Sequence, residues 1–374
     1  MNLNKFLLED YYEQHEFKTQ YMLSSSDPET WSLQNLLDMA TQKQLQLWNN
    51  QTFGYTEVRG LPLLRETIVK QLYPQFLPDN VLCFAGAEEG IFCSLLTLCS
   101  AQDHVIVVTP CYQSLKEIPQ FVGCAVTEVA LEEKSNWNID IDSIAAAIKP
   151  NTKVVVINFP HNPTGQIISQ QELQELVLLL KKHDIWLFSD EVYRLLSHQS
   201  LTWADPAAVL YDKAISLGVM SKAYGLPGLR IGWIACQDKT ILQQITQAKH
   251  YTSLCSSGPA EILAAIALDN QKLLLNRNRK ILSKNIAILD MFFSKYSDCF
   301  SWVRPQAGCT GFVRYKGKLP IESLCQQVRE QQGVLLLPSS VYDVQESYFR
   351  IGFGRSNMQE ALQRFEHFLQ SEGC

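Results

Sequence analysis

The chain has 374 residues, 46% of them hydrophobic and 19% charged, so it exceeds the usual size of one domain and lacks the polar composition of a disordered chain. Its 38 acidic and 32 basic residues give a net charge of −6 with no long run of either sign, which argues against nucleic acid as a partner. The 11 cysteines form no CxxC pair, which excludes a paired-cysteine zinc frame and disfavours a disulfide scaffold.

The first 22 residues carry acids and glutamines where a secretory signal needs an uninterrupted apolar run. No later segment offers about 18 consecutive apolar residues, the length that a membrane-spanning helix requires. We therefore expect a cytoplasmic protein that does not bind membranes, with most of its cysteines reduced and buried.

Short apolar runs alternate with helical patterns from about residue 60 onward, which predicts an α/β fold with a mostly parallel sheet covered by helices. A change of pattern after residue 300 predicts a smaller α+β domain that closes with an amphipathic helix from about Asn357. Strands are expected at 105–108, 154–158, 185–189, 214–218 and 231–235, near Phe312 and Val334, and at 348–352; helices are expected at 61–72, 88–99, 169–183, 239–250 and 259–293.

Three domain segments follow from this alternation. Residues 41–275 are predicted to form the large domain, and residues 276–374 the small one. The N-terminal segment, residues 1–40, is expected to join the small domain.

Polar side chains follow three predicted strands, at the edge where open α/β sheets bind ligands. HNPTG stands at 161–165, DEVY at 190–193 and MSKAYG at 220–225, with Arg230 beyond the third. Each of these is ordinary alone: a turn, a helix-capping acid and a surface lysine. Their order and spacing together indicate a functional site.

With Tyr55 upstream and Arg350 downstream, these residues resemble the class I/II aminotransferases, pyridoxal-phosphate enzymes of fold type I. The resemblance implies a large domain with a seven-stranded, mostly parallel sheet, a smaller α+β domain, and pyridoxal phosphate as the cofactor. The segments that carry it are FGYTEVRGLPLLRETI (53–68), GAEEGI (86–91), TPCY (109–112), NFPHNPTG (158–165), SDEVY (189–193), SKAYGLPGLRIGW (221–233) and YFRIGFG (348–354).

The resemblance gives roles to the residues around the cofactor ring. Lys222 takes the position of the lysine that holds the cofactor as a Schiff base and moves protons. Asp190 matches the carboxylate that pairs with the ring nitrogen and keeps it protonated. Asn162 and Tyr193 match the residues that hydrogen-bond the phenolic oxygen, and Tyr112 matches the aromatic residue that stacks on the ring.

The cofactor phosphate needs hydrogen-bond donors, and no metal site is expected. Arg230 offers a two-donor fork, and Ser221 offers a hydroxyl. Gly86, Ala87 and Glu88 open a predicted helix whose first amides can bind an anion.

Three further positions concern the substrate and the oligomer. Arg350 matches the family's clamp on the substrate α-carboxylate, to which Asn162 contributes. Ser25 belongs to SSSDPETWSL (24–33), which stands where many relatives have a glycine-containing segment over the substrate. Tyr55 matches a residue that reaches the cofactor phosphate of the neighbouring subunit, which implies a homodimer with shared active sites.

The sequence departs from the family pattern at the phosphate site. Val219 stands three residues before Lys222, where a phosphate-binding serine or threonine is common, so one hydrogen bond is missing. Glu88 and Glu89 place acids beside an anion site, and we expect both side chains to point away from it.

These motifs specify the cofactor better than the reaction. We predict an aminotransferase that moves an α-amino group from an amino acid to a 2-oxo acid. The alternative is a β- or γ-elimination, a replacement or a cyclisation of an amino acid on the same scaffold. A non-catalytic regulator of this fold is disfavoured because the chain has no helix-turn-helix segment to spare. A dicarboxylate substrate is weakly disfavoured because residues 251–259 contain no arginine.

Overall fold

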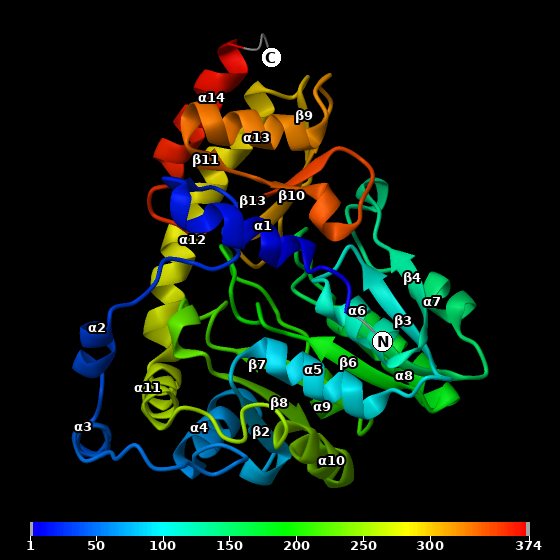
Figure 1. Ribbon diagram of the computed structural model, residues 1–374, viewed down its shortest axis with the longest axis vertical. Helices are drawn as coiled ribbons and strands as arrows, with labels where there is room; N and C mark the ends of the chain where they lie inside the picture. Colours follow the sequence, from blue (N-terminus) through cyan, green and yellow to red (C-terminus); the bar gives the residue numbers. More distant parts are fainter. Residues whose placement is uncertain (1–2, 372–374) are drawn as a thin grey trace.

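A seven-stranded sheet forms the framework of the lower part of the molecule in Figure 1, a computed structural model that describes residues 3–371. Its strand order is β2-β8-β7-β6-β5-β3-β4. The pairs from β4 to β7 are parallel, whereas β8 is antiparallel to both β7 and β2. The strands are β2 (Val81–Phe84), β3 (His104–Thr109), β4 (Ala125–Ala130), β5 (Thr152–Asn158), β6 (Trp186–Asp190), β7 (Ala214–Val219) and β8 (Gly232–Cys236).

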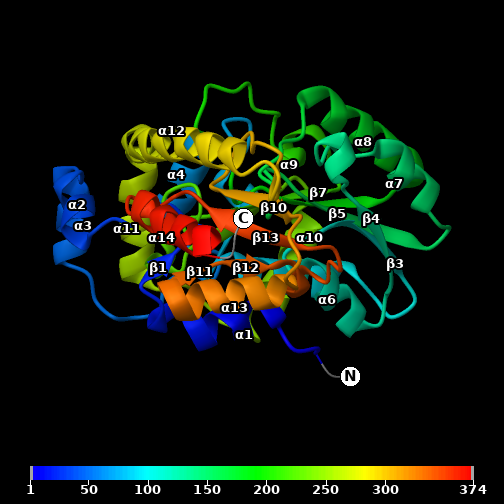
Figure 2. The same cartoon turned by 90° about the horizontal axis from the view of Figure 1, so that it is seen from above.

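Helices cover both faces of this sheet (Figure 2). Alternate residues of β3 enter different cores: Val105 and Val107 pack in the cluster that contains α5 and α6, while Ile106 and Val108 pack in the cluster that contains α7 and α8. This period of two explains why residues 105–108 of β3 are apolar at every position. The covering helices include α4 (Pro62–Leu72), α5 (Ala87–Leu98), α6 (Ser114–Val122), α7 (Ile141–Ala147), α8 (Gln170–His183), α9 (Ala207–Leu210), α10 (Lys239–Lys249) and α11 (Gly258–Asp269).

A second layer of structure lies above this sheet in Figure 1. Its four-stranded sheet has the order β12-β13-β10-β9, and β1 pairs in parallel with β11 in a two-stranded sheet. The N-terminal segment thus adds a strand to this part, while the division at residues 40 and 275 stays a prediction. The elements are β1 (Tyr21–Met22), β9 (Phe300–Trp302), β10 (Thr310–Tyr315), β11 (Val334–Leu335), β12 (Leu337–Pro338), β13 (Tyr348–Gly352), α12 (Gln271–Lys295), α13 (Ile321–Gln332) and α14 (Met358–Ser371).

The N-terminal helix α1 (Leu7–His15) lies between the two parts (Figure 1). The backbone N–H of Leu7 donates to Oε1 of Gln113 at the start of α6, at 2.9 Å. Four residues on, the Tyr11 hydroxyl donates to the carbonyl of Leu336, between β11 and β12, at 2.9 Å. Helix α1 therefore connects the two parts, and the short helices α2 (Leu33–Asp38) and α3 (Gln42–Asn49) follow it along the chain.

Most predicted elements are present, and the differences have local causes. Helix α8 begins with the predicted capping box of Ser169 and Glu172. The helix expected over 259–293 is interrupted at Asn270, whose side-chain amide donates to the carbonyls of Met39 and Ile266 at 3.2 and 2.8 Å. Strands β2 and β4 are not among the expected elements, and the strand at 231–235 is antiparallel. Within residues 3–371, no helix has both the length and the apolar character needed to cross a membrane.

Candidate active site

A cavity of about 660 Å³ opens at the carboxyl ends of the central strands, beneath the N-terminal segment. Residues from β5, β6 and β7 line its floor, and residues of α1 and of the loop after β1 line its opposite wall. Most of the predicted site residues meet here, as the common edge of parallel strands requires. Those that line the cavity are Ser25, Ala87, Glu88, Tyr112, Asn162, Asp190, Tyr193, Ser221, Lys222, Arg230 and Arg350.

Lys222 follows β7 and places its amine inside the cavity. Its Nζ donates to Oγ of Ser26 at 2.8 Å and lies 5.9 Å from the centre of the Tyr193 ring. Burial lowers the pKa of this amine below its ordinary value, although the nearby Asp27 carboxylate opposes the shift. A lysine with a depressed pKa has a larger neutral fraction, which is the form that attacks a carbonyl or accepts a proton.

Asp190 ends β6, and its carboxylate is buried. The backbone N–H of Val192 donates to Oδ1 at 3.1 Å. Desolvation by burial raises the pKa of this carboxyl to about 7, because the hydrogen bond and the Lys222 charge only partly offset it. A cation that docks against Asp190 would reverse this effect and restore the carboxylate.

Asn162 is fixed on both sides. Its backbone N–H donates to Oδ1 of Asn158 at 2.8 Å, and Nδ2 of Asn158 donates in turn to the carbonyl of Asp190 at 3.0 Å. The Asn162 Oδ1 accepts from the Tyr342 hydroxyl at 3.1 Å and from Nη1 of Arg350 at 3.2 Å. The side-chain oxygen is thus occupied, and the amide N–H groups remain for a ligand.

Arg350 lies on β13 and is 1% exposed. It makes five hydrogen bonds, all to neutral oxygens: besides Asn162, it donates to the hydroxyls of Tyr342 and Tyr12 at 2.6 Å each, and twice to the carbonyl of Ser24 at 2.8 and 3.2 Å. No carboxylate contacts this guanidinium in residues 3–371. A buried cation without a counterion in a cavity is suited to an incoming carboxylate.

The predicted phosphate end is built around Arg230. Gly86 does not line the cavity, but it makes the arginine's position possible: a Cβ on Gly86, whose φ is 95°, would lie 2.5 Å from Nη2 of Arg230. Ser221 lines the cavity beside Lys222. Val219 lines it as well, and its apolar side chain offers no hydrogen bond there.

The two glutamates that follow differ from each other. Glu89 points away as predicted, accepting from the backbone N–H groups of Ala85 and Ser253 at 2.6 and 3.0 Å. The expectation for Glu88 was wrong, because its side chain lines the cavity and accepts from the Ser114 hydroxyl at 2.8 Å. Burial raises the pKa of Glu88 to about 7, so the carboxyl is largely neutral in weak acid.

The aromatic residues carry contacts that the sequence did not indicate. Tyr112 donates to Oε1 of Glu9 on α1 at 2.7 Å, which ties the N-terminal helix to the cavity wall. The Tyr193 hydroxyl donates to the carbonyl of Ser26 at 2.8 Å. The Tyr193 hydroxyl oxygen can still accept a hydrogen bond from a ligand. To donate a hydrogen bond to a ligand, the hydroxyl must give up its bond to the Ser26 carbonyl.

Tyr55 is not brought to the cavity. Its side chain is 89% exposed, and it does not line the cavity of its own chain. Within residues 3–371, the Tyr55 side chain makes no hydrogen bond and no contact with another aromatic ring.

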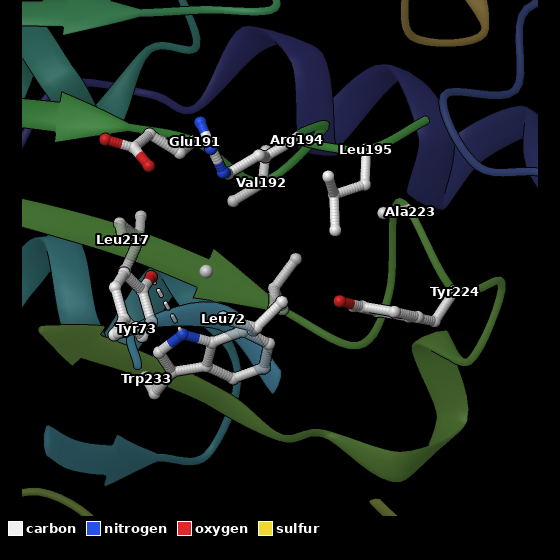
Figure 3. Close-up of a pocket in the computed structure, with 12 residues that line it drawn as sticks. Leu72, Tyr73, Glu191, Val192, Arg194, Leu195, Leu217, Ala223, Tyr224 and Trp233 are labelled. Atoms are coloured by element: carbon white, nitrogen blue, oxygen red, sulfur yellow. Dashed lines mark hydrogen bonds between the residues drawn. The ribbon is translucent and has the colours of Figure 1, made fainter. Parts of the chain in front are cut away.

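A second, much smaller cavity adjoins the site, and Figure 3 shows the side chains that line it. It encloses about 20 Å³, room for a single water, between Tyr224, Leu217 and Trp233, whose indole N–H donates to the Tyr73 hydroxyl at 3.3 Å. Val219 lines both cavities, so the end of β7 is the wall between them. The smaller cavity is a packing gap and not a binding site.

Sequence reasoning missed the residues that hold the predicted ones in place. Tyr12 is 338 residues from Arg350 in the chain, and Tyr342 and Ser26 follow no strand of the large sheet. No motif connects them to the site. Asn158 lay within the NFPHNPTG segment, and its position at the end of β5 was the one available signal.

Comparison with known proteins identifies one family and several relatives that match most of the chain. The family described as aminotransferase class I and II matches residues 18–365. Capreomycidine synthase of Streptomyces vinaceus is 28% identical over 350 residues, which cover 92% of this chain and 88% of that protein.

Two solved structures resemble the whole chain. One is a PLP-dependent aminotransferase from Streptococcus suis, with a TM-score of 0.93, 29% identity and 99% of both chains covered. The other is the PLP-dependent cyclase OrfR, with a TM-score of 0.91, 25% identity, and 100% of this chain and 98% of that chain covered. Members of one structural group therefore carry more than one reaction name.

Proposed function

Because the chain belongs to the aminotransferase class I and II family of pyridoxal-phosphate enzymes, we propose that it transfers an α-amino group from an amino acid to a 2-oxo acid, with Lys222 as the catalytic amine. One observation carries the proposal. A single cavity contains the Lys222 amine, the buried Asp190 carboxyl and the Arg350 guanidinium without a carboxylate partner.

The donor set fits pyridoxal phosphate. Lys222 supplies the amine for its aldehyde, Asp190 a buried carboxyl for its ring nitrogen, and Asn162 amide donors for its phenolic oxygen. Arg230 and the first amides of α5 supply donors for its phosphate. When bound, the cofactor acts as the electron sink that stabilises the carbanion formed at the substrate Cα.

The residues of this chain then have separate tasks. Arg350 binds the substrate α-carboxylate and so fixes the orientation of the Cα–H bond. Lys222 would remove the Cα proton as general base and, as general acid, would return it to the cofactor carbon bonded to the substrate nitrogen. With a pKa of about 7, Asp190 is only partly ionised near neutral pH without a cationic partner, and a protonated ring nitrogen would make its ionisation complete.

We propose in addition that two chains form a homodimer that shares its active sites. Tyr55 and its neighbour Phe53 are 89% and 94% exposed. Large aromatic side chains left bare in one chain are typical of a surface that a partner covers. In the dimer, Tyr55 of one chain would reach the cofactor phosphate of the other.

The reducing cytoplasm is the compartment we propose. Within residues 3–371, nine cysteines are free and eight of these are buried, which fits a protein kept in reducing surroundings. The domain boundaries at residues 40 and 275 are likewise proposals.

A cyclisation is the second candidate reaction, and the similarity to the cyclase OrfR favours it over an elimination or a replacement. The segment around Ser25, which lies against the substrate position, is the part of the cavity where transamination and cyclisation would differ.

The test has two steps. Borohydride reduction of the cofactor-loaded protein followed by peptide mapping should place the phosphopyridoxyl label on Lys222, with the surface residue Lys213 as the internal control. Single-turnover incubation with a panel of amino acids should then release one equivalent of 2-oxo acid per active site. Release of a cyclic product would favour cyclisation. Release of ammonia together with the 2-oxo acid would favour elimination, because a transamination half-reaction retains the amino group on the protein.

A further inference from the structure

The wall of the cavity opposite the sheet is acidic. Glu9, Glu16 and Asp27 line it, all from the N-terminal segment, and Arg355 is the cation beside them. Arg355 is already paired, since its Nη2 lies 2.8 Å from Oδ2 of Asp27. Among residues 3–371, the carboxylates of Glu9 and Glu16 thus have no cationic partner on this wall.

Of these two residues, Glu16 gives the stronger indication of a cationic ligand. It is half-buried. Its backbone N–H donates to the carbonyl of Tyr12, but its carboxylate makes no hydrogen bond or ion pair with any residue that the structure describes. The charged groups that act on it are Asp27, Glu9, Arg355 and Lys222. Burial, followed by repulsion from Asp27 and Glu9, raises its pKa above the ordinary value, and the two cations do not cancel these effects.

The position of this wall relative to Arg350 indicates which part of a bound amino acid it would contact. Arg350 is buried, has only neutral partners and lines the same cavity, so it fixes where an α-carboxylate binds. Lys222 fixes where the Cα must lie. The side chain of a bound amino acid then has the N-terminal wall as its remaining surroundings, which places it near Glu16.

We propose that the preferred amino acid substrate has a cationic side chain, an ammonium or a guanidinium, which is recognised by Glu16 together with Glu9 and Asp27. This inference rests on the proposed function and names its substrate class. A bound cation removes the repulsion among the three carboxylates and gives Glu16 the partner it lacks. A second carboxylate on the substrate is disfavoured, because Arg355 is held by Asp27.

The experiment compares matched substrates on the cofactor-loaded protein. Arginine and citrulline have nearly the same shape and differ in charge, and lysine and norleucine form a second such pair. We expect kcat/KM for arginine to exceed that for citrulline by at least about tenfold, with glutamate poorer than either. The increase in melting temperature caused by each compound measures binding independently of turnover.

Three variants locate the effect. Glu16→Gln should reduce the arginine-to-citrulline ratio by about fivefold or more, through KM, and Glu16→Asp should restore part of it. Glu13→Gln is the control, because Glu13 lies on α1 just before Glu16, is exposed and does not line the cavity.

The outcomes separate the two proposals. Transamination of citrulline or glutamate as fast as arginine, with equal thermal shifts, overturns the charge preference and leaves the function standing. A larger thermal shift with arginine but no 2-oxo acid supports the charge preference and overturns the function. If Glu16→Gln and Glu13→Gln have the same effect, the assignment to Glu16 is wrong.

Discussion

Asp190→Asn provides a test of the buried carboxyl in which the sign of the effect depends on the cofactor. In the cofactor-free protein, burial raises the pKa of Asp190 to about 7 from an ordinary value of 3.8. The folded state therefore binds a proton that the unfolded state has already lost between about pH 4 and pH 7, and stability falls as the pH rises through this range. Asparagine has nearly the same shape and does not titrate.

The size of the effect follows from the shift. About three pH units at about 1.4 kcal/mol each correspond to roughly 4 kcal/mol as an upper limit. Above pH 7 the cofactor-free Asp190→Asn protein should be more stable than the wild type by about 2–4 kcal/mol, and the gain should fall to less than half of that at pH 5 and nearly disappear below about pH 4. The side-chain oxygen of the introduced asparagine can still accept from the Val192 N–H, so no hydrogen bond is lost.

The assay is thermal unfolding of wild type and variant at pH 5 and pH 8, with and without pyridoxal phosphate. Asp184→Asn is the control, because the exposed Asp184 carboxylate has a pKa lowered by Lys213 and its removal should not stabilise the protein at pH 8. With the cofactor bound, the protonated ring nitrogen is a cation beside Asp190, so the same substitution should become destabilising and slow turnover by orders of magnitude. Destabilisation of the cofactor-free variant at pH 8 would refute this account of the carboxyl.

Four further outcomes are expected. Arg350→Ala should slow single turnover of α-amino acids by about 100-fold or more and Arg350→Lys by less, with decarboxylated amines unaffected; equal losses on both substrates would make the residue structural. Tyr12→Phe should raise KM several-fold at constant kcat because it removes a partner that orients Arg350, and a change in kcat alone would contradict this. The affinity for pyridoxal phosphate, measured by fluorescence quenching, should weaken from pH 6 to pH 8 as Glu88 ionises, and Glu88→Gln should abolish that slope. Dilution that separates subunits should release the cofactor, and Tyr55→Phe should increase this loss; a fully loaded monomer would exclude the shared site.

The floor of the site could be predicted because it depends on local patterns. Asp190 ends strand β6, and Asn162 and Lys222 follow the ends of β5 and β7 within four residues. The carboxyl ends of parallel strands meet at one edge. Sequence position alone therefore brings these side chains together. The helix interruption at Asn270 was not predictable in the same way, because it depends on a contact with Met39, 231 residues away.

Side-chain direction was also beyond a sequence pattern. Glu88 and Glu89 are adjacent, and the expectation that both turn away from the anion site was correct only for Glu89, which finds the backbone N–H groups of Ala85 and Ser253. Glu88 lies about 100° further round the helix and meets the Ser114 hydroxyl at the cavity wall. The hydrogen-bond donors that set the direction of each glutamate side chain lie mainly in segments outside its own helix.

The N-terminal segment explains why the shared motifs specify the cofactor and leave the reaction open. Residues 9–27 supply contacts around the proposed substrate position: Tyr12 and Ser24 hold Arg350, Ser26 holds the Lys222 amine, and Glu16 lines the wall proposed for the substrate side chain. None of these residues lies on the sheet that carries the cofactor-binding motifs. A change in this segment can therefore alter the substrate, or the bond that breaks, while Asp190 and Lys222 keep their positions. This separation fits the finding that proteins named as an aminotransferase and as a cyclase superpose on this chain with TM-scores of 0.93 and 0.91.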